Sequence, residues 1–257
     1  MIIIVPARIS SSRLKDKPLA DICGVPMVVR VAQRALSICK SVFVATDSPK
    51  IIDACRFYGV EALLTDSNLQ TGTDRIAQAA SMLNIDDEDI IVNLQGDEPL
   101  MPTDALNSVY KLLEDNSSAD IATLAHPITS YEEFISPNVV KVVINGKGQA
   151  LYFSRAPIPF PRDSFNDKII KYNSVFRHLG LYAYRMRFLK KYRDLEVPEV
   201  ESMENLEQLR AMFYGYKIQV GIIDKPLPPG VDTYADLQRV RAYLEEFHKK
   251  IKSKIDQ

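Results

Sequence analysis

Seven residues suited to binding an anion follow the first apolar segment of the chain. Residues 2–5 lead directly into a loop that carries three hydroxyls and four cations, namely Arg8, Ser10, Ser11, Ser12, Arg13, Lys15 and Lys17. A buried strand that opens into such a loop is typical of α/β sheets that bind a polyphosphate, because hydroxyls and backbone N–H groups bind its oxygens while cations neutralise its charge. A solvated basic loop is the competing interpretation. The position of the loop after the first strand favours the anion site.

Two carboxylates are candidates for holding Mg²⁺ beside that anion. Asp97 follows Gln95 and an apolar run at 89–94, where ligands of open α/β sheets bind. A carboxylate opposite a phosphate loop is a common Mg²⁺ ligand, although an acidic turn explains the same residues. Asp232 precedes a helical pattern, where Thr233 and Asp236 form a capping box. Asp232 then either complements the helix dipole or completes a Mg²⁺ site.

A further anion-binding position is predicted where the segment TGTDR opens a helix. Gly72 and Thr73 offer N–H groups and a hydroxyl to a ligand there. An ordinary N-terminal cap explains the threonine and Asp74 equally well. Arg75 does not fit that simpler explanation, because a cation in the first turn opposes the helix dipole.

Five residues of the second half remain open on spacing alone. His178 lies in an apolar strand, where a satisfied core histidine is the more common finding. Glu207 and Gln208 fit the solvated face of an amphipathic helix. Arg155 and Tyr182 lie in the segments FSRAPIPF and RHLGLYAY, and their types alone assign them no role.

The first half of the chain alternates apolar strands with amphipathic helices. Strands are predicted at 2–5, 41–46, 61–65, 89–94 and 121–125, and helices at 26–39, 49–58, 73–84 and 103–115. Short continuous apolar runs suit strands that are buried on both faces of a parallel sheet. The alternation predicts βαβ units with right-handed crossovers.

The pattern changes after residue 126. A hairpin is predicted from 139–145 and 150–154, a Pro-rich excursion at 155–175, strands at 175–184 and 217–223, and helices at 203–213 and from 233 onward. The sequence therefore predicts one α/β domain over 1–257, with a doubly wound and mostly parallel sheet. Residues 138–185 form an antiparallel insertion, which we expect to be the dimerisation region.

Composition excludes several classes of protein. The 257 residues carry a net charge of −1, whereas a nucleic-acid-binding protein would present a basic face. No apolar run approaches the length of about 20 residues that crosses a bilayer, so we expect a cytoplasmic protein without membrane insertion. Three separated cysteines fit neither a disulfide framework nor a zinc site. No GxGxxG follows the first strand, which disfavours a dehydrogenase.

Eight motifs in order resemble those of the 3-deoxy-manno-octulosonate (Kdo) cytidylyltransferases. They are PAR…SSR…K.P, TDS, TGTDR, NLQGDEP, ALYFSRAPIP, RHLGLYAY, LEQLRA and GVDT, and they extend from Pro6 to Leu237. The resemblance implies a Rossmann-like nucleotidyltransferase fold. It also implies transfer of CMP from CTP to Kdo, with release of pyrophosphate, for lipopolysaccharide biosynthesis.

The resemblance also implies roles for individual residues. Arg8, Arg13 and Lys17 would bind the triphosphate, and Asp97 and Asp232 would hold Mg²⁺. The nucleotide site would comprise Pro6, Ala7, Arg8, Ser12, Arg13, Lys17, Gly72, Thr73, Arg75 and Gln95. The sugar site would comprise Arg75, Gln95, Arg155, His178, Tyr182, Glu207 and Gln208.

Two departures from the family pattern accompany this resemblance. Lys15 and Asp16 stand where relatives usually carry Pro-Gly, and Thr71 and Asp74 stand where many carry Ser and Glu.

The alternative functions are the same reaction on 8-amino-Kdo or on another ulosonate such as sialic acid, and a catalytically dead nucleotide-binding module. A glycosyltransferase would be expected to show a DxD-type motif, and the nearest match here is QGDEP.

Overall fold

The computed structural model describes residues 1–10, 14–69 and 71–255, and these residues form two compact units. The first unit contains residues 1–84, 93–103 and the segment from 228 onward, and the second contains residues 85–92 and 104–227. None of the described helices is both long and apolar enough to cross a bilayer.

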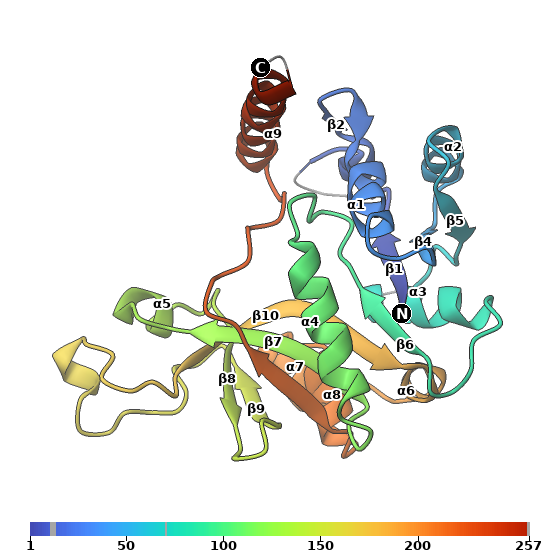
Figure 1. Ribbon diagram of the computed structural model, residues 1–257. Coiled ribbons are helices and arrows are strands. Elements are labelled where there is room, and N and C mark those ends of the chain that lie inside the picture. Colours follow the sequence, from blue (N-terminus) through green and yellow to red (C-terminus); the bar gives the residue numbers. More distant parts are fainter. Residues whose placement is uncertain (11–13, 70, 256–257) are drawn as a thin grey trace. The chain divides into compact units, whose positions relative to one another are not determined.

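The first unit is built on three parallel strands. β1 (Ile2–Ala7) pairs with β4 (Val42–Thr46), and β4 pairs with β5 (Glu61–Leu64). The helices α1 (Met27–Leu36), α2 (Pro49–Phe57) and α3 (Gly72–Ser81) pack against these strands (Figure 1). Ile3, Ile4 and Val5 are fully buried, as their continuous apolar run predicts. The strands and helices predicted for this region are confirmed to within a few residues.

The last helix of the chain completes the first unit. The chain adds a short 3₁₀ helix (Lys17–Leu19), the small strands β2 (Asp21–Ile22) and β3 (Val25–Pro26), and α9 (Tyr234–Ile255). α9 packs through Leu237 and Val240 against a core that includes Ile22, Met27 and Val231. Its start is fixed by the predicted capping box, in which Asp236 N–H donates to Thr233 Oγ1 at 3.2 Å.

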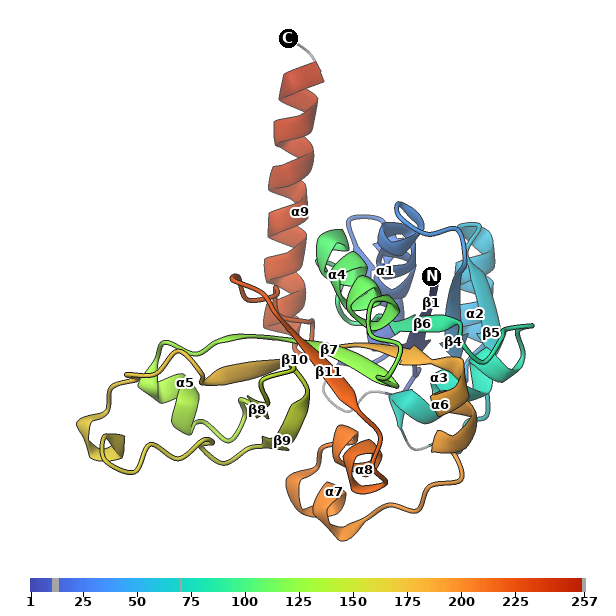
Figure 2. The same ribbon diagram turned by 60° about the horizontal axis from the view of Figure 1, so that its bottom comes forward.

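The second unit contains the antiparallel strands. β10 (Phe176–Arg185) pairs antiparallel with β7 (Ile121–Pro127) and with β8 (Lys141–Ile144), and β8 forms a hairpin with β9 (Ala150–Ser154) (Figure 2). β11 (Ile218–Ile222) runs parallel to β7. The unit also contains α4 (Thr103–Glu114), α5 (Tyr131–Ile135), a 3₁₀ helix (Phe165–Asp167), α6 (Met186–Tyr192), α7 (Glu199–Glu204) and α8 (Gln208–Phe213). Parallel strands, flanking helices and this antiparallel group confirm the predicted fold class.

One predicted helix is wrong in detail. The pattern at 203–213 predicts a single helix, but the chain forms α7 and α8 with a break between them. Asn205 adopts a left-handed conformation with φ of 51° and ends α7, while Leu206 N–H donates to Glu201 O at 3.2 Å. The predicted insertion 138–185 lies within the second unit, and its role as a subunit interface stays a prediction.

A close backbone approach fixes the segment after β6 (Ile90–Asn93) against β1. Leu94 N–H donates to Ile4 O at 3.2 Å, and a Cβ built on Gly96 would lie 2.9 Å from Pro6 O. A contact this short to a backbone oxygen admits only glycine. The residues that follow Gly96 are therefore held at the end of β1.

We predict that Gly96→Ala lowers the free energy of unfolding by about 1–3 kcal/mol, because the added methyl group must displace backbone. Gly72→Ala is the matched control in the same unit, since its Cβ would find its nearest neighbours at 4.0 Å. Urea denaturation of both variants measures the difference. Equal stability of the two variants would contradict the close approach.

Candidate active site

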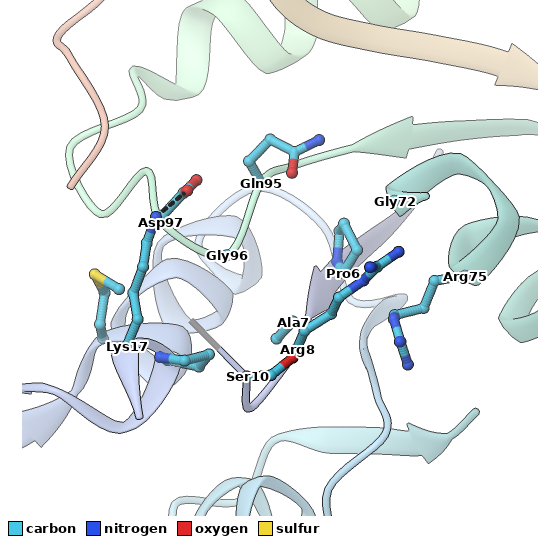
Figure 3. A pocket seen from close by; sticks show the side chains of 12 residues that line it. Pro6, Ala7, Arg8, Ser10, Lys17, Gly72, Arg75, Gln95, Gly96 and Asp97 are labelled. Carbon is cyan, nitrogen blue, oxygen red and sulfur yellow. Dashed lines mark hydrogen bonds and ion pairs between the residues drawn. The ribbon is translucent and has the colours of Figure 1, made fainter. Parts of the chain in front are cut away.

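A cavity of about 240 Å³ lies at the end of β1 in the first unit (Figure 3). Its lining brings together eight of the predicted nucleotide and catalytic residues, namely Pro6, Ala7, Arg8, Lys17, Gly72, Arg75, Gln95 and Asp97. Ser10, Pro18, Met27 and Gly96 complete the lining. Thr73 is buried in the first turn of α3 and does not line the cavity. Ser12 and Arg13 lie outside the described residues, so their predicted roles stay predictions.

The Lys17 ammonium contacts both predicted Mg²⁺-binding carboxylates. Lys17 Nζ lies 2.6 Å from Asp97 Oδ2 and 2.9 Å from Asp232 Oδ1 (Figure 3 draws the first contact). Burial lowers the pKa of Lys17, but the two carboxylates outweigh that effect and hold the pKa above its ordinary value. Asp97 and Asp232, 135 positions apart in the sequence, therefore face the same cationic point.

Backbone contacts bring these carboxylates together. Val231 N–H donates to Asp97 O at 2.8 Å, and a Cβ on Gly230 would lie 3.3 Å from the same oxygen. Asp232 N–H donates to Asp236 Oδ2 at 3.1 Å, so the capping box of α9 also orients Asp232. The capping interpretation and the functional interpretation of Asp232 are thus compatible, because the cap uses the Asp232 backbone while its carboxylate contacts Lys17.

Glu98 is a carboxyl group that the sequence did not single out as a site residue. Burial, with a smaller contribution from the Asp97 charge, raises its pKa to about 8. Its Oε2 atom is buried without a hydrogen-bond partner in the described part of the chain. Glu98 therefore carries a proton near neutral pH.

Arg75 is fixed by a network that sequence reasoning missed. Its side chain is 0% exposed, donates to Thr65 Oγ1, and lies 3.2 Å from Asp47 Oδ2. The other oxygen, Asp47 Oδ1, accepts the N–H of Ile9 at 3.1 Å. Asp47 thus joins the buried guanidinium to the backbone of the cationic loop. The only sequence signal for Asp47 was its place in the motif TDS, directly after β4.

Arg8 adds a second guanidinium beside this network, and Asp66 adds a second carboxylate. Burial lowers the pKa of Arg75, Asp47 counters that effect, and the charge of Arg8 lowers the pKa further. Arg8 Nη2 is itself buried without a hydrogen-bond partner among the described residues. Figure 3 shows the two guanidinium side chains close together at the cavity. Arg8 therefore presents a buried cationic nitrogen at the cavity, which suits an anion.

The predicted sugar residues Arg155, His178, Tyr182, Glu207 and Gln208 lie in the second unit. Arg155 follows β9 and donates through Nε to Glu204 O at 2.7 Å and through Nη1 to Pro137 O at 3.0 Å. Its backbone N–H donates to Glu204 Oε2 at 2.9 Å. The guanidinium therefore ties main-chain segments together in this structure, and its predicted contact with a sugar stays a prediction.

His178 lies beside an irregularity in β10. The register with β7 shifts between Leu179 and Tyr182, and Thr123 Oγ1 lies 3.0 Å from His178 Nε2 and 2.8 Å from Leu181 O. The Leu181 carbonyl can only accept, so the Thr123 hydroxyl donates its proton to that carbonyl. Thr123 Oγ1 then accepts from His178, which favours the tautomer that carries its proton on Nε2. Burial lowers the pKa of His178 to about 3, so the ring is neutral at physiological pH.

Tyr182 and Glu207 belong to one polar and aromatic cluster. The Tyr182 ring lies 5.3 Å from the His178 ring, and burial, followed by the charges of Tyr184 and Glu207, raises the Tyr182 pKa. Gln208 Nε2 and the Tyr192 hydroxyl are buried without hydrogen-bond partners among the described residues. These unsatisfied groups are available to a polar ligand.

A buried lysine supports the backbone of Arg155. Lys141 is 0% exposed, and its ammonium donates to the carbonyls of Val139 and Arg155 at 2.6 Å and of Ser136 at 2.9 Å. Burial lowers the pKa of Lys141 to about 8, against an opposing effect of Glu204 and a reinforcing effect of Arg155. No sequence pattern marked this residue.

The fold and the cationic cavity at the end of β1 are those of a nucleotide-binding α/β protein. A family model described as cytidylyltransferase matches residues 2–218. The 3-deoxy-manno-octulosonate cytidylyltransferase of Polynucleobacter necessarius is 51% identical over 244 residues, which are 95% of each chain. The chain belongs to the cytidylyltransferase family, and within it to the 3-deoxy-manno-octulosonate cytidylyltransferases.

Further similarities agree with this assignment. The protein of the same description from Francisella tularensis subsp. novicida is 48% identical, with coverage of 93% of this chain and 96% of that one. A solved CMP:2-keto-3-deoxy-manno-octonic acid synthetase complexed with CTP is 40% identical, with a TM-score of 0.87 over 95% of this chain and 98% of that chain. A cytidylyltransferase from Leptospira borgpetersenii, 17% identical with a TM-score of 0.59, covers 98% of this chain and 94% of its own, and shows the fold alone.

We predict that Asp47→Asn destabilises the protein by about 3 kcal/mol, because the buried Arg75 loses its counter-charge. Asp53→Asn is the control, since its pair with Arg56 is exposed on α2 and should cost less than about 0.5 kcal/mol. Differential scanning calorimetry at low and high ionic strength compares them. A loss for Asp47→Asn as small as that for Asp53→Asn would rule out the buried network.

We also predict a pH-dependent difference between the wild type and Lys141→Met. Between about pH 8 and pH 10.5 the unfolded chain retains a proton that native Lys141 has released. The free energy of unfolding of the wild type therefore rises with pH relative to the variant. Guanidinium denaturation over this range measures the difference, with exposed Lys147→Met as the control that should show no such trend. A relative stability that falls with pH would contradict the prediction.

Proposed function

We propose that this protein transfers the CMP group of CTP to the anomeric hydroxyl of Kdo and releases pyrophosphate, a step of lipopolysaccharide biosynthesis. The observation that carries the proposal is the identity of 51% over 95% of the chain with a relative described as 3-deoxy-manno-octulosonate cytidylyltransferase. The similar solved structure is described as complexed with CTP. The cavity geometry of the first unit supports the nucleotide half of the reaction.

In this proposal the triphosphate binds at the loop that follows β1. Arg8 supplies a buried Nη2 that has no hydrogen-bond partner within the described ranges, and Arg75, which also lines the cavity, adds a second positive charge. Lys17 lies in the same cavity and can place its ammonium on phosphate oxygens. Arg13, predicted from the sequence, would add a further cation. Negative charge on the phosphates is thereby balanced by side chains of this chain.

Asp97 and Asp232 fit a divalent cation. One ammonium lies within 2.9 Å of an oxygen of each, so a cation at that point is shared by both carboxylates. Hard oxygen ligands of this kind suit Mg²⁺, and phosphate oxygens and water would supply the remaining ligands. When bound, Mg²⁺ would neutralise charge on the phosphates and lower the pKa of the attacking hydroxyl.

The sugar half of the site is assigned to the second unit. The neutral His178 ring, Tyr182, Glu207 and Gln208 offer hydrogen-bonding groups that suit sugar hydroxyls. Gln95, whose Nε2 donates to Asn93 Oδ1 at 3.1 Å, would approach the sugar or the nucleotide from the cavity of the first unit. Arg75 of the first unit and Arg155 of the second each carry the charge that a sugar carboxylate requires, as the family resemblance implies.

The reaction requires little covalent help from the protein. The hydroxyl oxygen forms a bond to the α-phosphorus, the bond from that phosphorus to the bridging oxygen breaks, and pyrophosphate leaves with the electron pair. The hydroxyl proton passes to solvent. Arg8 and Lys17 hold the phosphates in line for this attack, which is a positioning and electrostatic role.

A homodimer and a cytoplasmic location accompany the proposed function. Phe160, Ile169 and Tyr172 of the excursion at 155–175 are 61%, 58% and 49% exposed, and large apolar side chains exposed on one segment suit a subunit interface. A second copy of this chain is the proposed partner, and light scattering of the purified protein would detect it. The cytoplasm is the compartment in which CTP is made.

The test is pyrophosphate release by the purified protein with CTP and Mg²⁺, compared among Kdo, 8-amino-Kdo and sialic acid. We expect release with Kdo, and none without the sugar or the metal. Release with 8-amino-Kdo or sialic acid alone would move the assignment to that sugar. CTP binding without release from any sugar would indicate a catalytically dead module.

Asp97→Asn is the control for the metal site. Loss of one of two carboxylate ligands should lower the rate by roughly a hundredfold or more at saturating Mg²⁺. A normal rate in this variant would remove Asp97 from the metal site while leaving the assigned reaction in place.

A further inference from the structure

The two proposed Mg²⁺ ligands already share a cation that belongs to the chain. Lys17 Nζ contacts Asp97 Oδ2 and Asp232 Oδ1 at 2.6 and 2.9 Å, and the lysine side chain is only 14% exposed. The carboxylates remain 34% and 50% exposed, so ions can reach them from solvent. A positive charge therefore occupies the point where their attraction for a cation is greatest.

The backbone of Lys17 is fixed, whereas its side chain can move. Lys17 N–H donates to Leu14 O at 3.2 Å, and Lys17 O accepts from Ala20 N–H at 3.1 Å in the short 3₁₀ helix. Asp16 precedes it in the left-handed conformation with φ of 49°. A four-carbon stem on a fixed backbone carries an ammonium that can swing between nearby acceptors.

An ammonium and Mg²⁺ cannot share this position. Both are attracted to the same two carboxylates, and like charges a few ångströms apart repel strongly in a half-buried site. The phosphates of a nucleotide offer Lys17 alternative acceptors, because Lys17 lines the cavity together with Arg8 and Ser10. Movement of the ammonium onto phosphate would remove Lys17 as a competitor of the metal at both carboxylates.

We propose that Lys17 is an internal counter-ion that blocks the divalent-cation site of the nucleotide-free protein and releases it when a triphosphate enters. The inference rests on the proposed function for the identity of the anion. The contacts of Lys17 with both carboxylates carry it. Reciprocal coupling follows. An anion that draws Lys17 away strengthens the binding of the metal, and the metal must then strengthen the binding of that anion by the same factor.

The proposal orders the events at the site. Metal alone binds weakly to the free protein, and the nucleotide and the metal bind together. Lys17 keeps the two carboxylates paired while the site is without nucleotide, which avoids an unbalanced pair of like charges. Lys17 therefore contacts the two carboxylates in the nucleotide-free protein and the phosphates after the nucleotide binds.

The experiment measures Mn²⁺ binding to the nucleotide-free full chain by the loss of the electron paramagnetic resonance signal of free Mn²⁺. We expect Lys17→Met to bind Mn²⁺ about tenfold more tightly than the wild type. Lys17→Gln, a second neutral variant, should behave alike, while Lys17→Arg retains the charge and should stay near wild type. Lys15→Met, which removes an exposed cation of the same loop, should change the affinity less than about twofold because the charge is screened.

Two results would overturn the proposal. One is Mn²⁺ affinity of Lys17→Met and Lys17→Gln no higher than that of the wild type. The other is an equal gain in Lys15→Met, which would make the effect one of overall charge. Adding Asp97→Asn to Lys17→Met or to Lys17→Gln should abolish the gain in Mn²⁺ affinity. Since neither nucleotide nor sugar is present, failure here leaves the proposed reaction standing, and failure of pyrophosphate release leaves this measurement interpretable.

Discussion

The close approach of Gly96 to the carbonyl of Pro6 is the constraint on which the candidate site depends. It presses the segment after β6 against the end of β1, so that Asp97 emerges beside the cationic loop. Val231 then donates to the Asp97 carbonyl and brings in Asp232 from a distant part of the chain. A side chain larger than hydrogen at position 96 would separate these elements. The two carboxylates proposed to bind the metal, the lysine that bridges them and the wall of the cavity thus follow from one steric fact.

The charges of the first unit form two separate arrangements around this constraint. Asp97 and Asp232 share the single positive charge of Lys17, whereas Asp47 pairs with Arg75 beside Arg8. The first arrangement attracts a cation once Lys17 leaves, and the second presents the Arg8 guanidinium to an anion. Lys17 and Asp97 of the first arrangement line the same cavity as Arg75 and Arg8 of the second, so a triphosphate with its divalent cation suits both. The protonated Glu98 adds no further negative charge near neutral pH.

The sequence predicted the framework well, because buried parallel strands and amphipathic helices have strong periodic patterns. The run at residues 2–5 and the motif NLQGDEP led to the edge of the strands at which the cavity lies, since strand ends carry ligands in this class of fold. Residues whose roles depend on distant partners were not predictable. Nothing local marks Asp47 as the partner of Arg75, or Lys141 as the support of the Arg155 carbonyl. The break between α7 and α8 was missed because an asparagine in the left-handed conformation is invisible to hydrophobic periodicity.

The type of cation at each position matches its task. Arg75 and Arg155 direct several donors of a rigid planar group at fixed acceptors, and such a group holds loops in place. Lys17 instead carries its charge on a flexible stem, which suits a residue that must change partners. Burial of Arg75 at 0% exposure makes its pair with Asp47 permanent, while the half-exposed Asp232 can exchange Lys17 for another cation. Fixed arginines and one movable lysine therefore allow a rigid cavity to accept a highly charged ligand without rearranging its backbone.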